Sequence, residues 1–194
     1  ETVTLDFESG SAPGYNPVQS IQITDQFEDS HGVIFSGDFS YLTQVGKNSS
    51  AWWAFGSSAG TDTLRSGEPD IGQFFLGEVY KNNLRMDFIA PVKTVSGLIF
   101  DVDGEVVTFT AKNELNQIIA TTVINSSSPH AGDGLATSWT IGSSNYDIAA
   151  IDVDVSGGLG IDNIIIDRSN VPEMNTLILF LFIILLLLYK RNLL

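Results

Sequence analysis

The sequence predicts an all-β domain, an antiparallel two-sheet sandwich, followed by one C-terminal transmembrane helix. Short β-branched and aromatic runs alternate with polar residues and are separated by Gly, Ser, Asn and Asp, which is typical of strands and turns. No long amphipathic helical pattern precedes the apolar C-terminal stretch. We therefore assign residues 1–168 to the sandwich, 169–173 to a linker, 174–189 to the helix and 190–194 to a short basic tail.

The strands follow one another in order along the chain. Val3, Leu5 and Phe7 alternate with polar residues and predict the first strand. Residues 96–124 indicate a meander, with Asp103-Gly104 as a tight hairpin turn and 114–117 as the next connection. Counted together, the pattern predicts about ten strands. The others lie at 20–24, 32–37, 50–55, 72–80, 83–91, 147–155 and 161–167.

Composition excludes several classes of protein. The chain has 194 residues with Lys+Arg 9 and Asp+Glu 23, a formal net charge of −14, which disfavours binding to nucleic acid. It has no cysteine, so disulfides and thiolate metal sites are excluded. The sequence begins at Glu1 inside a strand-like run, which favours an exported protein whose leader was removed, although a trimmed sequence would look the same.

The C-terminal stretch predicts a membrane anchor. Leu, Ile and Phe run without interruption from Leu177 to Leu188, and a helix over 174–189 would be roughly 24 Å long. Tyr189 suits the lipid interface, while Lys190 and Arg191 can reach the headgroups and should face the cytoplasm. This orientation predicts a single-pass inner-membrane protein in contact with lipid, with its N-terminal domain in the periplasm or outside the cell.

The residues around this stretch resemble a known sorting signal. Val171, Pro172 and Glu173, followed by a short hydrophobic helix and a basic end, resemble the PEP-CTERM signal of Gram-negative bacteria. The resemblance implies recognition by an exosortase-type processing enzyme and a link to exopolysaccharide or biofilm matrix. Met174 stands where that family usually has Pro, so a permanent anchor is the simpler outcome.

The body has a second resemblance. Its "LDFE" (5–8), "SIQITDQFEDSHGVIFSG" (20–37) and "GGLGIDNIII" (157–166) segments are similar to galactose-binding-like jelly-roll modules and to carbohydrate-binding modules of that fold. The resemblance implies a jelly-roll-like sandwich and a structural Ca²⁺ held by Glu8 and Asp162.

Strand parity agrees in part with the calcium site. Asp162 has the parity of Ile164 and Ile166, and a carboxylate that faces a core is costly unless it is paired or bound to metal. The alternative is that Ile161 and Ile165 face the core while Asp162 faces solvent.

Motifs for catalysis are weak. "GSSAG" (56–60) matches a nucleophile elbow around Ser58, but no helical pattern follows it, and His31 and His130 lie in turn-like segments. Two histidines are too few for a typical catalytic zinc site. "DVDG" (101–104) lacks the spacing of a calcium-binding EF-hand loop. The sequence therefore predicts a protein that is not an enzyme.

Aromatic residues are better candidates for ligand binding. Trp52 and Trp53 are adjacent on a predicted strand and must point to opposite faces. Trp53 shares parity with Phe55 and is assigned to the core, which leaves Trp52 as an exposed platform for a sugar ring, unless a loop covers it. Tyr80 and Trp139 are weaker candidates for the same role.

Two functions fit these observations. The first is a membrane-anchored binding module of the bacterial cell envelope, with affinity for glycan or an exopolysaccharide matrix. The second is an accessory or structural subunit of a multi-subunit inner-membrane complex, held there by its single helix.

Overall fold

The computed structural model describes residues 1–7, 12, 15, 22–37, 42–44, 74–78, 83–100, 102, 105–129, 136–156 and 159–168. Within this part of the chain, ten strands form and every strand pair is antiparallel. The predicted all-β antiparallel fold is therefore confirmed. The elements are β1 (Thr2–Leu5), α1 (Glu28–His31), β2 (Val33–Ser36), β3 (Leu42–Gln44), β4 (Phe74–Glu78), β5 (Asn83–Phe100), β6 (Val107–Lys112), β7 (Ile118–Ile124), β8 (Thr137–Gly142), β9 (Ile148–Val155) and β10 (Leu159–Arg168).

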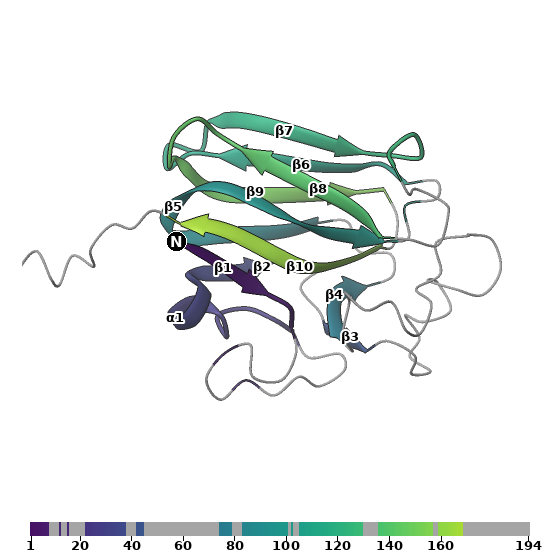
Figure 1. The fold of residues 1–194 in the computed structure, drawn as a ribbon, viewed down its shortest axis with the longest axis horizontal. Coiled ribbons are helices and arrows are strands. Elements are labelled where there is room, and N and C mark those ends of the chain that lie inside the picture. Colours follow the sequence, from purple (N-terminus) through teal and green to yellow (C-terminus); the bar gives the residue numbers. More distant parts are fainter. Residues whose placement is uncertain are drawn as a thin grey trace, which may run out of the picture.

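The long strand β5 belongs to two layers (Figure 1). Its first half pairs with β2 and β9, and β6 and β7 extend this back layer beyond β9. Its second half pairs with β8 and β10, and β1, β4 and β3 complete the front layer. Val92 marks the crossing, because it lies opposite both Ile148 of β9 and Arg168 of β10. The chain thus builds both layers around one strand.

The core lies between the two layers. Phe109 of β6 stacks on Trp139 of β8, with ring centroids 4.1 Å apart and an interplanar angle of 15°. These strands are not paired with each other, so the rings meet across the layers, where β8 passes in front of β6 in Figure 1. Strict alternation of buried and less buried residues in both strands turns one apolar face inward.

The structure differs from the sequence-based prediction in one strand pairing and in the length of one strand. Asp103 and Gly104 lie outside the described residues, but the strands that they would join as a hairpin, β5 and β6, are not neighbours, because β9 lies between them. Pro91 does not end its strand either: β5 continues through it, at a register shift between Asp87 and Val92. Proline is tolerated at such irregularities because no ladder hydrogen bond is required there.

The predicted connection at 114–117 and the last strand are confirmed. β6 and β7 form a hairpin around residues 113–117, where Asn113 N donates to Gln117 O at 3.0 Å and Asn116 adopts a φ of 60°. The last strand, predicted over 161–167, lies within β10. The predicted linker (169–173), membrane helix (174–189) and tail (190–194) lie outside the described residues. Among the residues that are described, no helix has the length and hydropathy to cross a bilayer.

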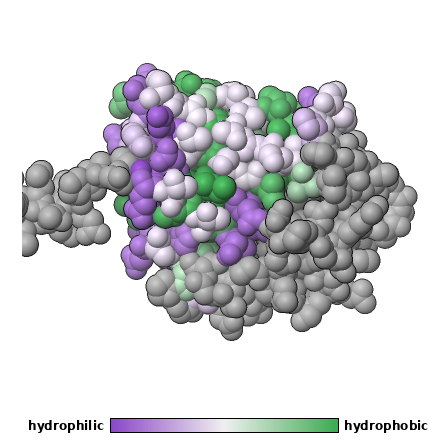
Figure 2. All heavy atoms as spheres, in the orientation of Figure 1, coloured by the Kyte–Doolittle hydropathy of each residue, from purple (hydrophilic) through white to green (hydrophobic). Residues whose placement is uncertain are grey.

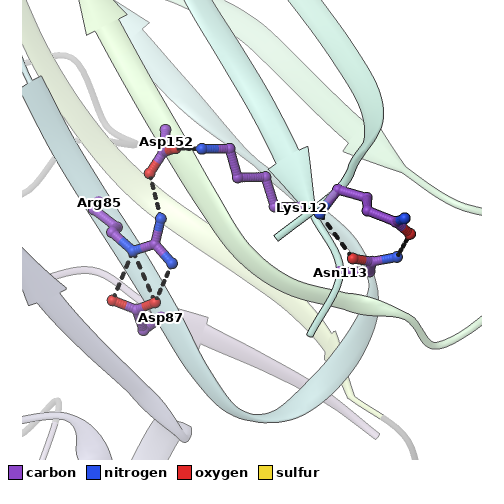
Figure 3. A network of polar contacts seen from close by, with 6 residues as sticks. Arg85, Asp87, Lys112, Asn113 and Asp152 are labelled. Atoms are coloured by element: carbon purple, nitrogen blue, oxygen red, sulfur yellow. Dashed lines mark hydrogen bonds and ion pairs between the residues drawn. The ribbon is translucent and has the colours of Figure 1, made fainter. Parts of the chain in front are cut away.

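An ion-pair network crosses the outer face of the back layer (Figure 3). Arg85 of β5 donates from Nε to Asp87 Oδ1 at 2.9 Å and from Nη1 to Asp152 Oδ1 of β9 at 2.8 Å. Lys112 of β6 binds the other oxygen of Asp152 at 2.5 Å. The hydrogen bond to Asp87 is the main reason that the pKa of Arg85 is raised above its ordinary value. The network therefore links three adjacent strands.

Candidate functional site

The outer face of the front layer carries a hollow of about 530 Å³, which we call the face hollow. Strand register explains its lining, because directly opposed residues on neighbouring strands share a face. Thr4, Ile165, Ser96 and Thr140 lie opposite one another in a row across β1, β10, β5 and β8. A second row brings Leu98 opposite Ser138. The lining residues are Thr4, Ser96, Gly97, Leu98, Ser138, Trp139, Thr140, Asn163 and Ile165.

A β-bulge in β10 shapes this face. The register shifts between Asp162, which lies opposite Leu98, and Ile165, which lies opposite Ser96. Two residues of β10, Asn163 and Ile164, therefore stand against one residue of β5, and Asn163 adopts a left-handed φ of 49°. Such an insertion bends the strand and increases its local twist. The bend lies beside the face hollow.

The lining of the face hollow is polar but uncharged, because Asp162, which lies opposite Leu98, is fully buried and is not among the lining residues. Neither an acidic nor a basic residue is among its lining residues. Within the described part of the chain, no side-chain hydrogen bond involves the hydroxyl groups of Thr4, Ser96, Ser138 or Thr140. Leu98 and Ile165, the latter 39% exposed, supply apolar surface between them. Figure 2 shows the molecule from this side, where hydrophobic green residues lie among pale residues of intermediate hydropathy, with hydrophilic purple residues beside them.

Trp139 is not the exposed platform that the sequence suggested, and that prediction is wrong. Its side chain is only 1% exposed, and its ring stacks on Phe109 inside the core. Strand parity explains the burial, because Trp139 lies between the outward-facing Ser138 and Thr140. Its buried Nε1 atom has no hydrogen-bond partner among the described residues. Trp139 therefore supports the face hollow from below and offers no ring to a ligand.

Asp162 is fully buried, at 0% exposure, so the alternative that placed it in solvent is wrong. The parity argument needs correction all the same. The bulge allows Ile161 and Ile164, on either side of Asp162 and Asn163, both to be buried, while Ile165 is exposed. A buried carboxylate fits one ligand of a cation site. Among the described residues, however, no group of three His, Cys, Asp or Glu side chains is placed to hold a metal ion.

The remaining predicted site residues lie outside the described part of the chain. They are Glu8, Trp52, Tyr80, Val171, Pro172, Glu173, Tyr189, Lys190 and Arg191. Conversely, sequence reasoning missed the Ser and Thr residues of the face hollow. Ser138 and Thr140 alternate with apolar residues on β8, which signals an outward polar face. Nothing in that alternation could indicate that Thr4 and Ser96 join them across β10 and β5.

Comparison with known proteins identifies similar folds. No family model and no curated protein matches the chain. A DUF4465 family protein from Bacteroides caccae is 11% identical with a TM-score of 0.52, and the match covers 87% of this chain and 100% of that chain. At this identity the likeness shows a shared fold alone.

Two further solved structures have lower TM-scores. The K1 cleaved adhesin domain of Lys-gingipain from Porphyromonas gingivalis is 11% identical with a TM-score of 0.41, over 88% of this chain and 99% of that one. TmCBM61, solved in complex with beta-1,4-galactotriose, is 13% identical with a TM-score of 0.41, over 77% of this chain and 100% of that one.

Proposed function

We propose that this protein is a non-enzymatic glycan-binding module of the bacterial cell envelope and that the face hollow binds a neutral sugar. The proposal rests mainly on one set of hydroxyl groups. No residue in the described part of the chain makes a hydrogen bond to the hydroxyls of Thr4, Ser96, Ser138 or Thr140. They surround apolar surface on a face whose lining carries no charge.

This combination matches the chemistry of a neutral saccharide. A Ser or Thr hydroxyl both donates and accepts, as each sugar hydroxyl does, so the two can exchange hydrogen bonds in either direction. The C–H face of a sugar ring is apolar and can cover Leu98 and Ile165. An anionic ligand would find no cation in the lining to offset its desolvation.

Paired hydroxyl substitutions test the proposal. Full-length protein in mild detergent is titrated calorimetrically with neutral oligosaccharides of galactose, glucose and xylose. Removing the opposed hydroxyls with Ser96→Ala/Thr140→Ala should weaken binding about 30-fold, since each hydrogen bond contributes about 1 kcal/mol. The matched control is Thr110→Ala/Thr121→Ala, an opposed pair on the back layer, which should bind like the wild type. Failure of every neutral oligosaccharide to bind, or equal losses in both variants, would refute the proposal.

The proposal includes a single-pass membrane anchor over 174–189 that holds the domain on the outer side of the inner membrane. Its support is the uncharged apolar stretch, with Tyr189, Lys190 and Arg191 at one end.

The proposal also includes a structural Ca²⁺ bound by Asp162 and Glu8. Its support is the complete burial of the Asp162 carboxylate between two buried isoleucines.

A further inference from the structure

A second hollow lies at one end of the molecule, on surfaces that the face hollow does not use. We call it the end hollow; its volume is about 270 Å³. It lies between the β6–β7 turn, the β8–β9 loop and the crossing point of β5, at the end where Figure 1 places the N-terminus. The lining residues are Pro91, Asn113, Glu114, Leu115, Tyr146 and Asp147.

The walls of the end hollow are held in place by local hydrogen bonds. Asn113 Oδ1 accepts from Leu115 N at 3.0 Å and from Gln117 N at 2.9 Å, and its Nδ2 donates to Gln117 Oε1 at 3.0 Å. Part of this arrangement is visible around Asn113 in Figure 3. On the other side, Ser143 N donates to Lys93 O at 3.0 Å and ties the β8–β9 loop to β5. The hollow is therefore preorganised by the fold.

Its chemistry differs from that of the face hollow. Tyr146 is 44% exposed and Leu115 is 78% exposed, and with Pro91 they provide an aromatic and aliphatic wall. Glu114 and Asp147 provide two carboxyl groups, and no basic residue is among the lining residues. An open aromatic ring beside two acids suits a ligand that has an apolar face and a positive charge.

Asp147 adds an observation that points to a cation. Its Oδ1 atom is buried and receives no hydrogen bond from any residue that the structure describes. Asp147 as a whole is only half-buried, so the cost of lost water falls on this one oxygen, and a cation held against the carboxylate offsets it. Of the two described lysines, Lys112 is engaged with Asp152, and Lys93, which the strand register places beside Asp147, forms no ion pair with it.

We infer that the end hollow binds a protonated amino sugar. The ammonium group pairs with Asp147 and Glu114, and the sugar ring stacks on Tyr146. The small volume fits about one hexose ring, since pockets for drug-sized ligands begin near 300 Å³. A net charge of −14 also attracts a polycationic glycan from solution. This inference extends the proposed glycan binding to a second site with its own specificity.

Acetylation of the ligand supplies the first test. Full-length protein in detergent is titrated with a trimer of glucosamine and with the matching trimer of N-acetylglucosamine, which has the same backbone without the charge. The glucosamine trimer should bind at least about tenfold more tightly, and added salt should weaken it. Equal affinity for both trimers overturns the inference. Tight binding of a lysine oligomer with no binding of the glucosamine trimer overturns it as well.

Substitutions assign the binding to this hollow. Asp147→Asn and Glu114→Gln keep the side-chain shapes and remove one charge each. Each should lower the affinity for the glucosamine trimer at least about tenfold. Tyr146→Ala should also weaken it, while Asp154→Asn, an exposed acid elsewhere on β9, should not. Unchanged melting temperatures confirm that the variants fold. Unchanged affinity in both Asp147→Asn and Glu114→Gln overturns the inference.

The binding proposed for the face hollow and that proposed for the end hollow can be refuted independently. The Ser96→Ala/Thr140→Ala variant should keep its affinity for the glucosamine trimer, and Tyr146→Ala should keep any affinity for neutral oligosaccharides. Loss of neutral-sugar binding throughout, with amine-dependent binding intact, refutes the function of the face hollow and leaves the end hollow standing. Binding of neutral sugars without amine-dependent binding refutes only the amino-sugar site in the end hollow.

Discussion

Replacing Gly97 by alanine places a methyl group against the side of the core that supports the face hollow. A Cβ atom at Gly97 would lie 3.1 Å from Nε1 and 3.2 Å from Cε2 of Trp139, and 3.1 Å from the backbone oxygen of Asp162. These separations are a few tenths of an ångström shorter than ordinary contacts. Either the indole ring or the bulged strand β10 must therefore move.

Neither neighbour can move freely. The indole ring is 1% exposed and stacks on Phe109, so it has no path into solvent. The oxygen of Asp162 belongs to the main chain of a paired strand. Overpacking of this kind lowers the free energy of unfolding by about 1–3 kcal/mol. The reduced conformational freedom of the unfolded chain raises it by about 0.4–1 kcal/mol. We expect a net loss of about 1–2 kcal/mol, or about 2–8 °C in melting temperature.

A double-mutant cycle tests this reasoning. Circular dichroism follows thermal unfolding of the wild type, Gly97→Ala, Trp139→Phe and the double variant, all as full-length protein in detergent. Phenylalanine lacks the five-membered ring that carries Nε1, so Gly97→Ala should cost less than half as much when residue 139 is Phe. If Gly97→Ala stabilises the protein, or lowers its stability equally in both backgrounds, then contact with Trp139 does not cause the loss of stability.

Three further outcomes are expected. Asp152→Asn should lower the free energy of unfolding by about 1 kcal/mol in chemical denaturation, and by less in high salt, because its ion pairs with Arg85 and Lys112 are partly exposed. Calcium chelation should lower the melting temperature of the wild type by about 5 °C, and Asp162→Asn should abolish this calcium dependence, because it removes the charge of a metal ligand. Removal of residues 174–194 should release the domain from the membrane fraction, as judged by ultracentrifugation and immunoblotting.

Each of these has a contradicting result, and the first also has a control variant. Asp154→Asn, on the same strand and exposed, should leave stability within about 0.5 kcal/mol, and a loss equal to that of Asp152→Asn would argue against a network effect. A wild-type melting temperature that chelation does not change would show that Asp162 binds no calcium. Full-length protein that stays in the supernatant without detergent would refute the anchor.

Much of the local structure could be predicted from sequence. Val107–Lys112 alternates apolar and polar residues within the predicted meander and forms a strand. Thr137–Gly142 shows the same alternation and also forms a strand, although it was not among the predicted strands. The connection between β6 and β7 was also predictable, because Asn and Gln clustered between two apolar runs favour a turn. These features depend on side-chain order within a few residues, which the sequence displays directly.

The candidate sites could not be predicted in the same way. The face hollow joins Thr4 to Ser96 across β10, although the two residues lie far apart in the chain. The end hollow joins Tyr146 to Leu115 through two separate connections. Each residue taken singly looks like an ordinary turn or surface position. Only strand order brings them together.

The sequence by itself determined that the described chain forms antiparallel strands and where several of them begin and end. The tertiary structure decided that β5 serves two layers, that Trp139 is buried and that a bulge changes the parity of β10 after Asp162. Alternation is a local property, so it specifies a strand and its two faces. The choice of partner, and the single inserted residue that shifts every later side chain, depend on packing free energies between segments distant in sequence.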